Sequence, residues 1–207
     1  NEEVVMDGFS CVWKPKGMTS HDVVLRLRRI LNTKKIGHSG TLDPDVPGVL
    51  VVGVNRATKC LNYLPEHTKE YLGTVVLGAA TETEDASGAV IDSRSVQEIP
   101  KEQLDRVLQL RHGVQIQIPP MYSAVKVQGK KLYEYARAGA SVTRPSREIT
   151  IHQLKQTSPL IYDKDHNQAS FNIYVACSKG TYIRTLAVDI GKDLGYPAHL
   201  GSLMRLS

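Results

Sequence analysis

The chain has 207 residues, 41% of them hydrophobic, so it can bury the core of one domain, or of one domain with a small insertion. Its 26 lysines and arginines outnumber 21 acids, and the formal net charge of +5 is a mild bias toward polyanionic partners. Three widely spaced cysteines indicate neither a disulfide framework nor a zinc site, which favours a reducing, cytoplasmic location. Residues 1–8 carry acids, and no segment approaches the ~18 apolar residues of a membrane span, so we expect neither export nor membrane insertion.

The N-terminal part predicts a strand over residues 9–13 and then a helix. Thr19, with Asp22 three residues on, has the form of a capping box that begins this helix. Its apolar residues share one face: Val23, Val24, Leu27, Ile30 and Leu31. Its other face is basic and continues toward the next loop: Arg26, Arg28, Arg29, Lys34 and Lys35. A solvated helix face is the simpler interpretation of these charges, and a surface for a polyanion is the alternative.

The segment GHSGTLDPDVPGVL, residues 37–50, surrounds Asp43 with three glycines and two prolines. Gly37 and Gly40 permit backbone angles that a side chain disfavours, and Pro44 restricts Asp43 to extended conformations. The apolar run over residues 49–52, with Val54 beyond it, predicts a buried strand that anchors the turn. A carboxylate held on a rigid turn suggests catalysis, although Asp-Pro is also an ordinary way to begin a turn.

The remaining elements predict a mixed α/β domain on a largely antiparallel sheet. In order they are a short helix over 57–64, a strand over 69–77, an acidic turn over 81–88, a helix over 100–110 and strands over 115–118, 149–154 and 171–177. The helix over 100–110 should turn Leu104, Val107 and Leu108 inward, and the last two strands should pair antiparallel. A final helix follows residues 178–181 and carries Arg184 in its first turn, where a cation opposes the helix dipole and so requires a nearby acid.

Cations and tyrosines alternate between the strands at 115–118 and 149–154. The cations are Lys126, Lys130, Lys131, Arg137, Arg144 and Arg147, and the aromatics are Tyr122, Tyr133 and Tyr135. This composition suits a surface that grips phosphates and stacks on bases. A hairpin and a short helix with solvated lysines would fit the same pattern.

Several of these stretches resemble the TruB family of pseudouridine synthases. The resemblance rests on HSGTLDP at 38–44, KPKGMTS at 14–20, KEYLG at 69–73, PPMYSAVKVQGKKLYEYARAG at 119–139 and SKGTYIRTLAVDIGKDLG at 178–195, and so covers nearly the whole chain. It implies the pseudouridine synthase fold over residues 1–207, with residues 121–151 as a mobile thumb that closes over RNA. Bacterial members usually continue into a C-terminal PUA domain, which we do not expect within residues 1–207. Asp45, Val46, Pro47 and Ser39 depart from the residues usual in bacterial members.

The resemblance also implies a role for individual residues. Asp43 would be the catalytic carboxylate, Tyr71 would stack on the target uracil and act as general base, and Arg184 would pair with Asp43. His38 could fill the stack that a flipped base leaves, and Asp85 would lie in the active-site cleft. The residues implied in RNA or substrate binding are His38, Asp85, Tyr182, Leu203, Lys14, Lys126, Lys130 and Lys131. No cofactor and no metal is expected.

The implied reaction is isomerisation of uridine 55 in the T-loop of tRNA, with no obligatory protein partner and a monomeric enzyme. The glycosidic bond from N1 to C1′ breaks, the uracil turns, and C5 joins C1′. Asp43 could attack C1′, add to C6, or assist a glycal route in which Tyr71 deprotonates C2′, and family resemblance favours the glycal route.

Two other functions remain open from the sequence. The first is the catalytic subunit of a guide-RNA-dependent pseudouridine synthase, against which the insertion at 121–151 argues. The second is a non-catalytic protein that binds or folds tRNA, against which the joint presence of Asp43, Tyr71 and Arg184 argues.

Overall fold

The computed structural model describes residues 6–65 and 68–207, and its internal contacts divide the chain into two compact units. The first unit comprises Asn1–His67 and Leu203–Ser207, and the second comprises Thr68–Ser202. Residues 1–5 of the acidic N-terminal segment lie outside the described part. Within that part, no helix is both long and apolar enough to cross a membrane.

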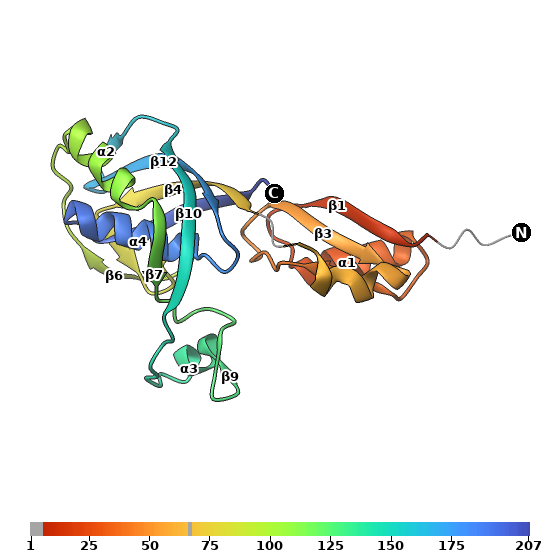
Figure 1. Ribbon diagram of the computed structural model, residues 1–207. Helices are drawn as coiled ribbons and strands as arrows, with labels where there is room; N and C mark the ends of the chain where they lie inside the picture. Colours follow the sequence, from red (N-terminus) through yellow and green to blue (C-terminus); the bar gives the residue numbers. More distant parts are fainter. Residues whose placement is uncertain (1–5, 66–67) are drawn as a thin grey trace, which may run out of the picture. The chain divides into compact units, whose positions relative to one another are not determined.

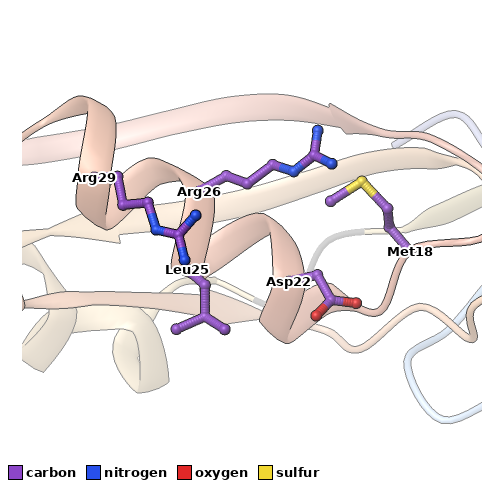
Figure 2. A pocket seen from close by; sticks show the side chains of 5 residues that line it. All are labelled: Met18, Asp22, Leu25, Arg26 and Arg29. Carbon is purple, nitrogen blue, oxygen red and sulfur yellow. The ribbon is translucent and has the colours of Figure 1, made fainter.

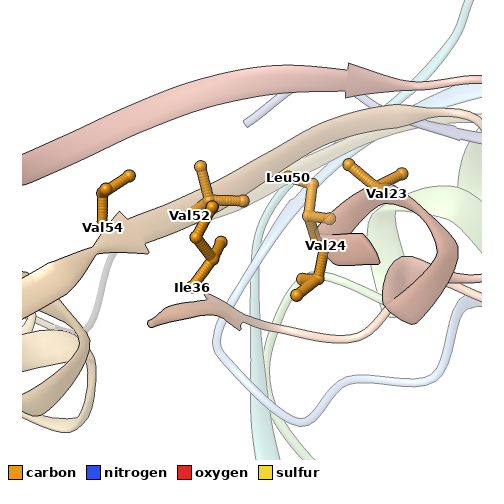
Figure 3. Packing of buried hydrophobic residues seen from close by; sticks show 6 residues of the cluster. All are labelled: Val23, Val24, Ile36, Leu50, Val52 and Val54. Carbon is orange, nitrogen blue, oxygen red and sulfur yellow. The ribbon is translucent and has the colours of Figure 1, made fainter. Parts of the chain in front are cut away.

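The first unit is built on β3 (Gly48–Val54), which pairs antiparallel with β1 (Gly8–Lys14) and with β2 (Ile36–Ser39). A 3₁₀ helix, η1 (Asn55–Tyr63), follows β3, and α1 (Ser20–Ile30) lies between β1 and β2 in the chain. Buried side chains from α1, β2 and β3 form one apolar cluster (Figure 3): Val23, Val24, Ile36, Leu50, Val52 and Val54. Alternate residues of β3 supply half of that cluster, as the apolar run predicted.

The start of α1 confirms the predicted capping box. The hydroxyl of Thr19 accepts a hydrogen bond from the Asp22 amide at 3.0 Å, and the Asp22 carboxylate accepts one from the Thr19 amide at 2.9 Å. The prediction for Ile30 is wrong, because this last helical residue is 74% exposed. The apolar face ends instead with Leu27 and Leu31, which pack against the buried cluster.

The glycine-rich stretch differs from the prediction at its beginning. Gly37 lies in β2 rather than in a turn, and its φ is not positive. A Cβ at Gly37 would approach Leu61 Cδ1 of η1 to 3.1 Å, a tight contact with the end of a flexible side chain. Gly40 does have a positive φ of 73°, as its place in the turn predicted.

The sheet of the second unit has the strand order β13-β4-β12-β10-β7, and β11 is added beside β12. These strands are β4 (Lys69–Leu77), β7 (Gly113–Gln117), β10 (Arg147–Gln156), β11 (Ile161–Asp163), β12 (Gln168–Cys177) and β13 (Ala198–Arg205). The pairs β4–β12, β12–β10 and β10–β7 are all antiparallel. The predicted mixed α/β fold with a largely antiparallel sheet is therefore confirmed.

Two helices contact this sheet and each other (Figure 1). They are α2 (Lys101–Leu110), whose Leu104, Val107 and Leu108 are buried as predicted, and α4 (Ile183–Leu194). The small sheet of β5 (Ala79–Thr81) and β6 (Val90–Ser93) was not predicted. All four residues of β6 are exposed, so the strand carries no apolar alternation that could reveal it.

The segment between β7 and β10 projects from the ends of these two strands (Figure 1). It holds β8 (Lys126–Val127), β9 (Lys130–Lys131) and α3 (Leu132–Arg137). Leu132 is fully buried, and the Tyr135 hydroxyl donates to the Val127 carbonyl at 3.0 Å. The segment is thus a hairpin and a short helix, held together by one apolar side chain and local hydrogen bonds.

Candidate active site

Asp43 lies exposed in the turn between β2 and β3 of the first unit. The turn is closed by a hydrogen bond of 3.0 Å from the Val46 amide to the Asp43 carbonyl. The preceding residue, Leu42, is buried, and its amide and carbonyl both bond to the hydroxyl of Ser20, at 2.9 and 3.2 Å. The first turn of α1 therefore fixes the backbone beside the carboxylate.

Lys14 holds the same turn through hydrogen bonds to backbone carbonyls. Its side chain is fully buried, and its ammonium donates to the carbonyls of Pro15, Met18 and Pro44 at 3.1, 2.6 and 3.1 Å. Burial lowers the pKa of Lys14, and the charge of Asp43 partly opposes this shift. The resemblance implied an RNA contact for Lys14, but this geometry favours a residue that positions the Asp43 turn.

Arg205 was not singled out from the sequence, yet it holds both sides of the turn. Its guanidinium donates to the carbonyls of Val49 and Gly40 at 3.0 and 2.9 Å, and its amide donates to the Pro47 carbonyl at 3.0 Å. Gly48 has φ +144°, and a Cβ there would lie 2.2 Å from the Arg205 carbonyl oxygen. The sequence signal that could have identified Arg205 is its position as a single arginine in the largely apolar C-terminal strand.

His38 lies half-buried in β2, opposite Val52 of β3. Burial and then the nearby charge of Arg205 lower the pKa of its imidazole, so the ring is neutral at neutral pH. Its Nδ1 is buried, and among the described residues it has no hydrogen-bond partner.

Arg184 is the second residue of α4, in the second unit, and only 11% of its side chain is exposed. Its guanidinium donates to the carbonyls of Thr83 and Tyr122, both at 3.0 Å, and lies 3.8 Å from the Asp85 carboxylate. The predicted need for an acid near this cation is thus met by Asp85. The pairing of Arg184 with Asp43 stays a prediction.

Asp85 and Glu84 are adjacent acids with opposite pKa shifts. Burial raises the pKa of Asp85, but hydrogen bonds from Ser87 and Thr83, together with the Arg184 charge, outweigh it and leave the pKa below its ordinary value. For Glu84, burial dominates and raises the pKa, despite a hydrogen bond of 2.9 Å from the Thr185 hydroxyl. The acidic turn is therefore a built network rather than a solvated loop.

The aromatic candidates of the second unit occupy β4 and the start of α4. Tyr71 is half-buried, opposite Val175 of β12. Tyr182 immediately precedes α4, and both its amide and its carbonyl bond to the side chain of Gln117, at 2.8 and 3.0 Å. Gln117, almost fully buried, is a second supporting residue that sequence reasoning missed. Leu203, also a candidate, is half-buried in β13 and belongs to the first unit.

In the projecting segment, Lys126 and Lys130 are exposed. Lys131 and Arg137 lie 5.4 and 5.2 Å from the centre of the Tyr133 ring. The hydroxyls of Tyr135 and Tyr122 donate to the Val127 carbonyl and to the Glu82 carboxylate. The tyrosines expected to stack on bases thus make contacts within the protein, while Lys126 and Lys130 face solvent. Among the described residues, no cluster of three or more His, Cys, Asp or Glu side chains could hold a metal.

Solved structures share this architecture. The chain aligns with the structure described as a "Cbf5-Nop10-Gar1 Complex" at a TM-score of 0.64 and 30% identity, over 96% of this chain and 47% of the other. It aligns with an archaeal "box H/ACA sRNP Nop10-Cbf5 complex" at a TM-score of 0.65 and 28% identity, over 97% and 47%. The fold is therefore that of pseudouridine synthases.

The model of the TruB family pseudouridylate synthase N-terminal domain matches residues 28–183, and the chain belongs to this family. A relative named tRNA pseudouridine synthase B from Oceanobacillus iheyensis is 56% identical over 97% of this chain and 65% of its own length. The protein of the same name from Bacillus pumilus is 50% identical, also over 97% and 65%. The chain thus spans about two thirds of the length of these relatives.

Proposed function

We propose that this chain isomerises uridine to pseudouridine in tRNA, at position 55 of the T-loop. The observation that carries the proposal is the exposed carboxylate of Asp43 on a turn held by Lys14, Ser20 and Arg205. Such a turn presents one acid in a fixed orientation, as covalent catalysis requires. The name shared by relatives that are 50 to 56% identical supports tRNA as the substrate.

Three residues share the chemistry in this proposal. Asp43 acts as the nucleophile, Tyr71 stacks on the uracil and serves as general base, and Arg184 keeps Asp43 ionised and oriented. An opposite charge within ~4 to 6 Å lowers a carboxyl pKa by about 1 to 3 units. The distance of 3.8 Å between the Arg184 guanidinium and the Asp85 carboxylate supports a site in which that cation lies close to carboxylates.

The target base must leave the RNA stack before Asp43 can reach it. Enzymes that act on bases extrude the nucleotide into a pocket, at a cost of a few kcal/mol for unstacking. His38 is proposed to fill the gap, and its neutral imidazole suits stacking between bases. The exposed lysines Lys126 and Lys130 supply charge for the phosphates, as expected of a thumb.

The test of this function uses the purified chain and unmodified tRNA, with no guide RNA and no other protein. Pseudouridine should appear at the T-loop uridine, and its position can be mapped by chemical modification and primer extension. Pseudouridine that forms only when a guide RNA is added would favour the guide-dependent alternative. Tight binding of tRNA with no pseudouridine formed would favour a non-catalytic binding protein.

A further inference from the structure

The outward face of α1 contains a shallow hollow of about 280 Å³ within the first unit. Its lining combines two guanidinium groups with two apolar side chains and one acid: Met18, Asp22, Leu25, Arg26 and Arg29. Figure 2 shows four of these side chains on α1 and Met18 on the segment that precedes it. Guanidinium groups beside apolar side chains make a suitable surface for a sugar-phosphate chain.

The hollow carries a net positive charge, because Asp22 faces two arginines in its lining. Residues 16–35 contain six lysines and arginines and a single acid, Asp22. The Asp22 carboxylate is occupied by the helix cap, since it accepts from the Thr19 amide and hydroxyl at 2.9 and 2.7 Å. Within the described part of the chain, neither Arg26 nor Arg29 has a hydrogen bond or an ion pair, whereas Arg28 donates to the Ile36 carbonyl.

The helix that carries these arginines is rigidly joined to the catalytic turn. Ser20, in the first turn of α1, exchanges two hydrogen bonds with Leu42, the residue before Asp43. Any group bound on the outer face of α1 is therefore held at a fixed place relative to Asp43.

We infer that Arg26 and Arg29 bind the phosphate backbone of the RNA substrate, with a ribose lying against Leu25 and Met18. This inference rests on the proposed function. It adds a second phosphate-binding site, on the first unit, to the one proposed for the lysines of the thumb. Because guanidinium groups contact phosphates through two parallel hydrogen bonds, each arginine can fix one phosphate. The contact contributes affinity and register rather than sequence selectivity.

The test compares the salt dependence of tRNA binding for wild type, the double variant Arg26→Gln/Arg29→Gln, and a control. The control, Lys101→Gln/Arg106→Gln, removes the same charge from exposed positions on α2. Loss of two phosphate contacts should reduce the slope of log K against log salt by about 1.4 to 1.8, and the control should leave it unchanged.

Each outcome decides the inference. A slope lowered only in the Arg26→Gln/Arg29→Gln variant supports it, and each single variant should then lower the slope by about half as much. Equal slopes for this variant and wild type, or equal losses in variant and control, would overturn it. If wild-type protein binds tRNA with the full slope but forms no pseudouridine, the proposed activity fails while the phosphate contact stands.

Discussion

Lys14→Met is the substitution that tests most directly how the catalytic turn is held. Methionine nearly preserves the volume of the lysine stem but removes the ammonium that donates to the carbonyls of Pro15, Met18 and Pro44. The Pro44 carbonyl keeps a second partner, the Gly17 amide at 2.8 Å. The main loss therefore falls on the carbonyls of Pro15 and Met18.

The expected cost follows from these contacts. A hydrogen bond to a charged group contributes about 1.5 to 3 kcal/mol, so the loss of the two part-buried bonds to Pro15 and Met18 predicts about 3 to 6 kcal/mol. Methionine recovers part of this sum, because burying an ammonium is itself unfavourable. We expect the free energy of unfolding to fall by about 2 to 4 kcal/mol, a large share of the 5 to 15 kcal/mol typical of a domain.

Urea denaturation measures this loss. Trp13, the only tryptophan in the chain, precedes Lys14 in β1, so its fluorescence reports on this part of the first unit. Lys16→Met, at an exposed position in the following loop, is the matched control and should leave the urea midpoint unchanged. Pseudouridine formation by Lys14→Met should also fall, since Asp43 precedes Pro44. Wild-type stability and turnover in Lys14→Met would refute this reasoning.

Three further predictions concern other parts of the chain. Gly48→Ala should lower the free energy of unfolding by about 1 to 3 kcal/mol more than Gly129→Ala, because only the Cβ at position 48 would collide with backbone atoms, those of Arg205. Equal thermal midpoints for the two variants would contradict this. The pKa of Glu84 is raised in the folded state, so the stability of wild type should decline relative to Glu84→Gln as pH rises from the ordinary value of 4.5 through the folded-state pKa. A stability difference that stays constant over this pH range would contradict the prediction. Lys130→Ala/Lys131→Ala should lower the salt slope of tRNA binding by about 1.4 to 1.8, and an unchanged slope would show that the thumb does not grip phosphates.

Local sequence signals predicted most elements of the fold. The capping box of Thr19 and Asp22 located the start of α1, and the strand predicted over residues 69–77 has the bounds of β4. The inward face of α2 and the antiparallel pairing of β10 with β12 were likewise predicted. These features depend on neighbouring residues, so the sequence states them directly.

Residues that act through distant contacts were not predictable in the same way. Arg205 reaches the Gly40 carbonyl 165 positions away, and Gln117 reaches Tyr182 across 65. Nothing local shows that three carbonyls surround Lys14, for which the resemblance implied an RNA contact. The partner of Asp85 is likewise distant in sequence, since Arg184 lies in α4. In each case the tertiary fold supplies the partner.

The role of Asp43 is the central claim, and Asp43→Asn tests it most directly. Asparagine suits the same turn and keeps much of the hydrogen bonding, but it lacks the anionic oxygen that a nucleophile requires. The measurement is pseudouridine formed in unmodified tRNA by the purified variant, alongside its urea midpoint and its affinity for tRNA. We predict wild-type stability, retained or slightly raised affinity, and no detectable pseudouridine. Pseudouridine formed at a near wild-type rate would contradict the assignment of Asp43 as the catalytic residue.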